Sequence, residues 1–144
     1  MDDPRNNKSR RGTMVVEAAL ILPLLLILTF GGIKYGWLFI KWQQATNVAR
    51  HAVRYAIRPT IDSAQTVSLI DELMTNAEMD KGKVNYTPSV TYGADDYPTG
   101  NIVGDTVTVQ IIVPVADVDI LKLTGLLPTP TTLTARMTMS KEGP

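Results

Sequence analysis

The longest hydrophobic run of the chain extends from Met14 to Ile33, and within these twenty positions Glu17 is the only ionisable residue. A helix of this length rises about 30 Å, roughly the thickness of the hydrocarbon core of a bilayer. Helices buried in soluble proteins rarely stay apolar on every face for so long. The pattern therefore predicts a single membrane-spanning helix.

Apolar residues continue at helical spacing after this run. They recur at intervals of three and four residues, at Leu38, Trp42, Ala45, Ala49, Ala52 and Ala56. This spacing keeps one narrow, mostly alanine face apolar, which permits close approach by the chain's own C-terminal part or by another stem. Arg50, Arg54 and Arg58 fall on another face, and Pro59 is expected to end the helix because it disfavours helical geometry at the residue before it.

A helix and three strands are predicted beyond Pro59. Asp62, with Gln65 three residues later, is typical of a helix N-cap, and an apolar face continues to about Met79. The positions of this face are Ala64, Val67, Ile70, Met74 and Ala77. Alternating apolar and polar residues then predict strands over 84–92, 107–113 and 133–139. Pro88 indicates an edge position for the first strand.

A short helical turn is expected within residues 117–127, ending at Gly125. The predicted fold class is α+β: a long N-terminal transmembrane helix extends into a stem and packs on a small antiparallel sheet domain with one further helix. The expected domains are a basic cytoplasmic leader over 1–12, the transmembrane and stem helix over 13–58, and an exported head over 59–144.

The formal charge is zero overall but unevenly distributed, with +2 on residues 1–12, +4 on 13–58 and −6 on 59–144. An acidic head is not expected to bind nucleic acid. The basic leader favours a cytoplasmic N-terminus, although the basic residues after the span mean that charge alone does not settle orientation. A cleavable secretory peptide fits poorly, because the apolar core is long and no small-x-small site precedes a polar mature start.

Glu17 is the exception in the apolar run. A carboxylate near the membrane interior costs a few kcal/mol, so such residues usually have a partner and a function. The alternative is that Glu17 lies close enough to the interface to reach water among the headgroups.

The residues around Glu17 resemble the class III signal of type IV pilin-like proteins, in which a prepilin peptidase cleaves after a glycine. Here Gly12 is followed by Thr13, and Glu17 is the fifth residue after the glycine. The resemblance implies that Glu17 pairs with the N-terminal amine of an adjacent subunit. Cleavage would create that ammonium at Thr13, and pairing two buried charges between chains makes the contact specific for register.

A closer resemblance is to the TadE-like pseudopilins of tight-adherence (Flp pilus) systems, and it is carried by the motif RRGTMVVEAALILPLLLIL over residues 10–28. Ala18 follows the glutamate where the main Flp pilins have an aromatic residue, which argues against a major Flp pilin. The resemblance implies a minor pilin of the bacterial inner membrane. Its partners would be the prepilin peptidase, other pilin or pseudopilin subunits, the inner-membrane assembly platform and the lipid bilayer.

The sequence contains no recognisable combination of catalytic residues. The absence of cysteine excludes disulfides and thiolate sites, and His51 is expected to be solvated on the stem. The segment GADDYPTGN over 93–101 contains carboxylates, but their spacing matches no regular calcium loop. We predict no enzyme activity, no cofactor and no metal. The alternative functions are an unprocessed single-span protein whose head binds an envelope partner, and an enzyme on an export anchor.

Overall fold

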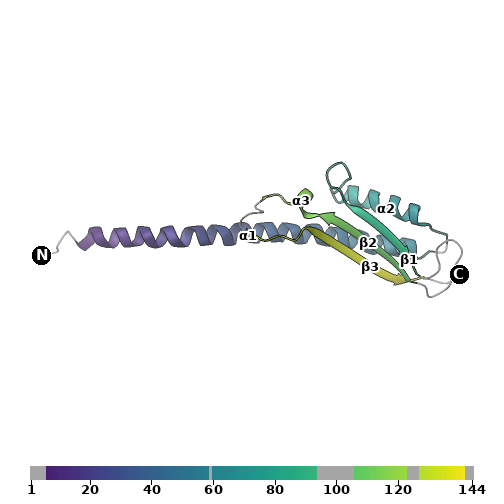
Figure 1. Ribbon diagram of the computed structural model, residues 1–144, viewed down its shortest axis with the longest axis horizontal. Helices are drawn as coiled ribbons and strands as arrows, with labels where there is room; N and C mark the ends of the chain where they lie inside the picture. Colours follow the sequence, from purple (N-terminus) through teal and green to yellow (C-terminus); the bar gives the residue numbers. More distant parts are fainter. Residues whose placement is uncertain (1–5, 59, 94–105, 123–126, 142–144) are drawn as a thin grey trace. The chain divides into compact units, whose positions relative to one another are not determined.

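The computed structural model describes residues 6–58, 60–93, 106–122 and 127–141 (Figure 1). The first helix, α1, extends from Asn6 to Ala56. The chain divides into two compact units, Met1–Gly36 and Trp37–Pro144, so that α1 begins in the first unit and ends in the second.

The first unit consists of α1 up to Gly36, and its apolar side chains are exposed along the predicted span. Met14 is 71% exposed and Leu28 is 77% exposed. Soluble monomeric proteins rarely expose a continuous apolar surface of this length. Among the described residues, one helix is long and apolar enough to cross a membrane, and it contains this run. Pro23 lies inside the helix.

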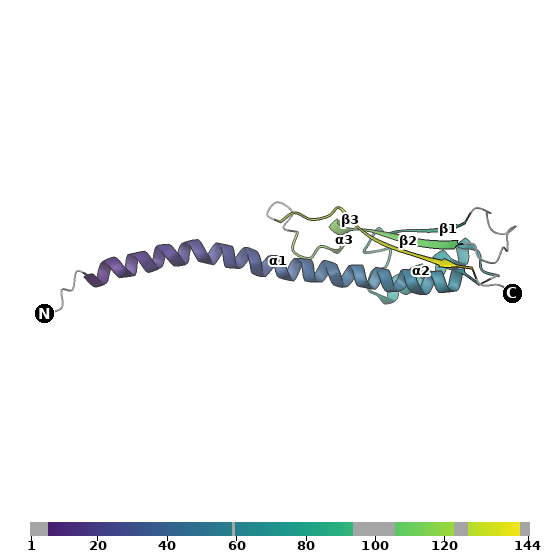
Figure 2. The same ribbon diagram turned by 90° about the horizontal axis from the view of Figure 1, so that it is seen from below.

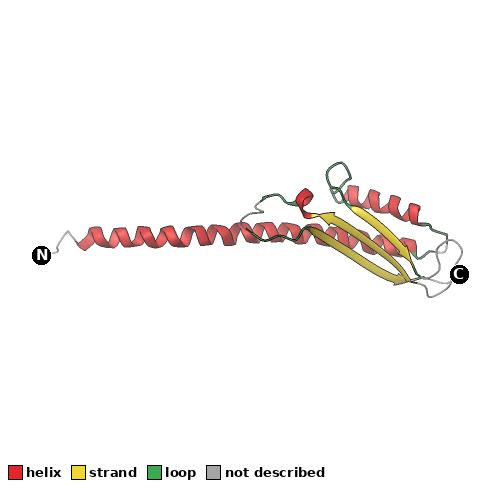
Figure 3. Ribbon diagram, viewed as in Figure 1, coloured by secondary structure: helices red, strands yellow, loops and turns green. Residues whose placement is uncertain are grey.

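The second unit contains a three-stranded antiparallel sheet in the order β1-β2-β3 (Figure 3). The strands are β1 (Thr87–Tyr92), β2 (Thr106–Pro114) and β3 (Thr132–Ser140). Ile112 of the central strand pairs with Thr87 on one side and Thr134 on the other. Because β1 is at an edge, Pro88 does not interrupt a central ladder, as the sequence predicts.

Two helices cover one face of the sheet in the second unit. The part of α1 from Trp37 onward and α2 (Ser63–Asn76) lie on the same side of the three strands (Figure 2). The central strand alternates, with Val107, Val109, Ile111 and Val113 at most 1% exposed and the intervening side chains half-exposed. This two-layer arrangement is the predicted α+β class, in which a sheet buries one apolar face against helices.

The start of α2 is the N-cap predicted from the sequence, and in the structure it forms a capping box. The Asp62 carboxylate accepts the Gln65 backbone N–H at 2.7 Å, and the Gln65 side chain accepts the Asp62 N–H at 3.2 Å. The helix ends at Asn76, somewhat earlier than expected. Ile70 and Met74 are fully buried on its inner face, whereas Ala64 is exposed and Thr66 is buried in its place.

The first strand is shorter than predicted. Val84 and Tyr86 are buried but precede β1, whose pairing with β2 begins at Thr87, opposite Ile112. The backbone N–H of Asn85 donates to the Asp117 carboxylate at 2.9 Å instead of to a strand carbonyl. The alternating pattern predicts which side chains are buried, but not where the pairing of the two strands begins.

The short helical turn occurs earlier than predicted. Helix α3 is Val115–Val118, whereas the DILKL segment from Asp119 onward is not helical over its described residues. Val115 and Val118 are three residues apart and are both buried, so the turn allows both valines to reach the core. The predicted end at Gly125 lies outside the described residues.

Candidate processing and assembly site

The predicted processing and assembly residues lie near the start of α1. The peptide bond between Gly12 and Thr13 belongs to the helix, and Thr13 and Glu17 are both exposed. Residues four apart on a helix share a face, with about 5 to 6 Å between their Cβ atoms. Cleavage would create an ammonium on the backbone nitrogen of Thr13, about one helical turn before Glu17 along the chain.

The surroundings of Glu17 are apolar and open. Met14, Val16 and Leu20 are between 62% and 74% exposed, so this unit does not itself cover the carboxylate. In a bilayer or a packed filament such a surface loses its water, and an ionised carboxylate then needs a hydrogen-bonded or cationic partner. The geometry suits a contact made with another molecule.

Two further features of the first unit concern helix approach and flexibility. Pro23 has no backbone N–H to donate to Ala19, so one helical hydrogen bond is missing at this turn. A Cβ built on Gly32 or Gly36 would meet nothing within 4 Å, so the small-residue pair is open to a close neighbour.

The alanine stripe of the stem packs on the chain's own head. Leu38, Ala45, Ala49, Ala52 and Ala56 are all at most 4% exposed and belong to the same core as the sheet. This resolves the two alternatives left by the sequence, because a buried stripe cannot also receive another stem.

The buried face of the stem is wider than the predicted stripe. Val48, Val53 and Ile57 are also buried, and they flank the alanines at helical spacing. Trp42 was expected in the stripe but is 41% exposed, and its indole N–H donates to the Thr134 carbonyl at 3.2 Å. The indole is too large for the close helix-to-sheet approach that the alanines permit.

The opposite face of the stem is basic and exposed. Arg50, His51, Arg54 and Arg58 are all exposed, and the Arg58 guanidinium lies 5.5 Å from the Tyr55 ring centroid. The position of His51 among arginines in solvent agrees with the prediction of a solvated histidine. The face presents positive charge to whatever lies beside the stem.

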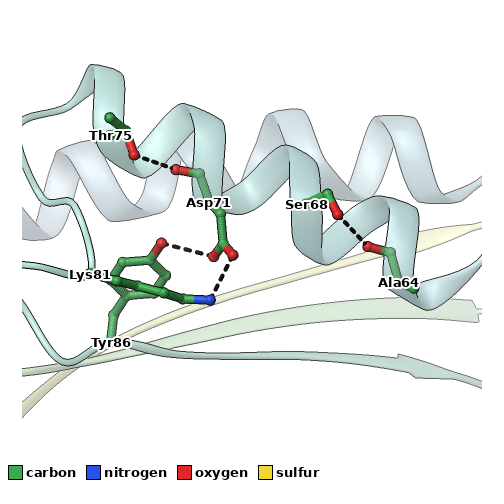
Figure 4. A network of polar contacts seen from close by, with 6 residues as sticks. All are labelled: Ala64, Ser68, Asp71, Thr75, Lys81 and Tyr86. Carbon is green, nitrogen blue, oxygen red and sulfur yellow. Dashed lines mark hydrogen bonds and ion pairs between the residues drawn. The ribbon is translucent and has the colours of Figure 1, made fainter.

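A polar network connects α2 to the segment before β1 (Figure 4). The Tyr86 hydroxyl donates to one Asp71 oxygen at 2.8 Å, and the Lys81 ammonium contacts the other at 2.6 Å. Burial, and the hydrogen bond to Asp71, raise the pKa of Tyr86 above its usual value. Both oxygens of the Asp71 carboxylate have partners, so we infer that this network stabilises the fold.

The described residues contain no arrangement typical of catalysis or metal binding. No group of three His, Asp or Glu side chains among them could hold a metal ion. The Ser68 hydroxyl donates to the Ala64 carbonyl at 3.0 Å, a local helix contact. The carboxylates of the segment 93–101, Asp95 and Asp96, lie outside the described residues.

Residues 12–54 match the sequence model of the family described as TadE-like protein. The matched segment extends from the predicted cleavage site through the apolar run to Arg54 on the stem. It confirms the resemblance found in the motif over residues 10–28. No curated protein and no solved structure matches the chain significantly.

Proposed function

We propose that this chain, with its TadE-like segment over residues 12–54, is a minor pilin or pseudopilin of a Tad/Flp-type pilus. In this proposal a prepilin peptidase removes residues 1–12, and the mature subunit takes part in filament assembly for adhesion or secretion. The role is structural, and the chain catalyses no reaction.

The observation that carries the proposal is a single acidic residue in the apolar run from Met14 to Ile33, whose large side chains are exposed, five positions after Gly12. Glu17 is exposed beside Leu20, which is 74% exposed, and the family match includes both. Cleavage after Gly12 would provide a cation one helical turn from this carboxylate. Pairing between subunits would neutralise both groups inside an apolar filament core.

The proposed location follows from the same elements. The apolar run anchors the precursor in the bacterial inner membrane as a single span, with the basic leader in the cytoplasm and the head exported. The head then reaches the envelope space, where the assembly platform and other subunits are the proposed partners. Incorporation would transfer the apolar helix from lipid into the filament core.

The direct test is the N-terminal residue of the protein recovered from membranes of its natural host, by intact mass and terminal sequencing. We expect a chain that starts at Thr13. A Gly12→Leu variant should retain the leader, which links the cleavage to this site. An intact leader on the unaltered protein, in cells with an active prepilin peptidase, would instead favour the permanently anchored single-span protein.

A further inference from the structure

The second unit carries an exposed apolar residue on the segment that follows α3. Ile120 is 59% exposed, and its neighbours Val118 and Asp119 are both 7% exposed. The turn is held in place, because the Leu121 backbone N–H donates to the Asp119 carboxylate at 3.2 Å. Ile120 is thus presented on an ordered turn.

This turn is hydrogen-bonded to the stem through Trp37. The indole N–H of Trp37 donates to the Val118 carbonyl at 2.9 Å. Trp37, Lys41, Val118 and Ile120 are among the residues that line one recess. Ile120 is therefore held beside the first turn of the stem in this unit.

Trp37 must lie close to the membrane surface if the apolar run spans the bilayer. Only three residues separate it from Ile33, so the covalent chain keeps the two within about 14 Å of each other. Tryptophan is enriched at the headgroup level, and lysine side chains near this level extend their ammonium groups toward water. The Lys41 ammonium lies 5.1 Å from the centroid of the Trp37 ring, which adds a cation to the same level.

We propose that the turn from Val118 to Lys122 contacts the headgroup layer of the membrane and inserts the Ile120 side chain among the lipids. The contact adds a second membrane attachment to the head, besides the span. It rests on the membrane anchoring in the proposed function, but not on cleavage or filament assembly.

The partner that fits this surface is a lipid bilayer, because the turn is attached to the stem close to the end of the span. Val118 is hydrogen-bonded to Trp37, which lies four positions beyond the end of the apolar run. Ile120 follows Val118 by two residues, so their Cα atoms lie within about 7 Å of each other. Lys122 is exposed, whereas Asp117 and Asp119 carry the opposite charge on the same turn. We therefore expect apolar insertion to dominate over attraction to anionic lipids.

The chain has no cysteine, so single-cysteine labelling can test the contact directly. The full chain, labelled with a polarity-sensitive fluorophore at Ile120→Cys, is reconstituted into vesicles of phosphatidylcholine with or without phosphatidylglycerol. Ala64→Cys is the matched control, because Ala64 is also exposed and belongs to the start of α2, which lies at the opposite end of the sheet from α3 (Figures 1 and 2). Circular dichroism checks that both labelled proteins are folded.

We expect a blue-shifted emission at position 120 and quenching by nitroxide-labelled lipids at least about twofold stronger than at position 64, in both vesicle types. Equal quenching at the two positions would overturn the proposal. A blue shift at position 120 that grows with the protein-to-lipid ratio, without lipid quenching, would also overturn it by showing contact with another copy.

A third label separates this inference from the function on which it rests. Leu28→Cys places the probe inside the apolar run, on a side chain that is 77% exposed. Deep lipid quenching at position 28 with none at position 120 rejects the membrane contact of the turn alone. Absence of quenching at position 28 rejects the span itself.

Discussion

The Tyr86 hydroxyl donates a hydrogen bond to the Asp71 carboxylate at 2.8 Å and so joins the segment before β1 to the middle of α2. The Tyr86 ring is 6% exposed, and the Lys81 ammonium lies 5.6 Å from its centroid. Tyr86 thus contacts both α2, through Asp71, and the turn that follows this helix, through Lys81.

Tyr86→Phe should therefore lower the free energy of unfolding of the head by about 1 to 2 kcal/mol, since the Asp71 carboxylate loses a partially buried donor. Urea unfolding of the full chain in detergent micelles, followed by circular dichroism, measures the change. Tyr55→Phe is the control, because that residue contacts Arg58 through its ring.

The same pair predicts the behaviour of the head at high pH. Burial and Asp71 raise the pKa of Tyr86, so its protonated form stabilises the fold fully below an ordinary tyrosine pKa of about 10. This contribution is lost as the pH rises beyond that value toward the raised pKa. Tyr86→Phe should weaken the alkaline loss of stability, and an unchanged alkaline profile would contradict the assignment.

Asp80 should titrate at lower pH than an ordinary aspartate. Its hydrogen bond with the Lys83 side chain lowers the pKa, and burial opposes this in part. The lowered pKa means that the stabilising contribution is present above the unfolded pKa and is lost as the pH falls through the folded pKa. NMR titration should place Asp80 below 3.8, and Lys83→Met should move it upward.

The alanine face of the stem should not accept larger side chains. Ala52 is fully buried between α1 and the sheet, so Ala52→Leu should destabilise the head by about 1 to 3 kcal/mol through overpacking. His51→Leu introduces the same side chain one residue earlier on the exposed face and should leave the unfolding midpoint almost unchanged. Similar urea midpoints for the two variants would argue against the packing described for the stem.

Glu17→Ala should separate processing from assembly. We expect the leader to be removed as in the unaltered protein, while incorporation into filaments fails because the new amine lacks its partner. Leu20→Ala, which shortens another exposed side chain nearby, should retain incorporation. Immunoblots of membrane and sheared-filament fractions measure both steps, and normal incorporation of Glu17→Ala would exclude the pairing role.

Local patterns were sufficient where the responsible residues are close in the chain. The apolar run and the TadE-like motif are contiguous, and the Asp62–Gln65 cap depends on hydrogen bonds over three residues. Alternation in the central strand was equally clear, because a sheet with one buried face requires every second residue to be apolar. These features determine the α+β class, the candidate span and the candidate cleavage site.

The tertiary structure decided the features that depend on distant partners. Packing against the sheet, and not spacing along the helix, buries Val48 and leaves Trp42 exposed. The bond from Trp37 to Val118 joins residues 81 positions apart, and no local pattern identifies such a pair. Periodicity indicates which face of an element is apolar, whereas the element that covers this face is determined only when the whole chain packs together.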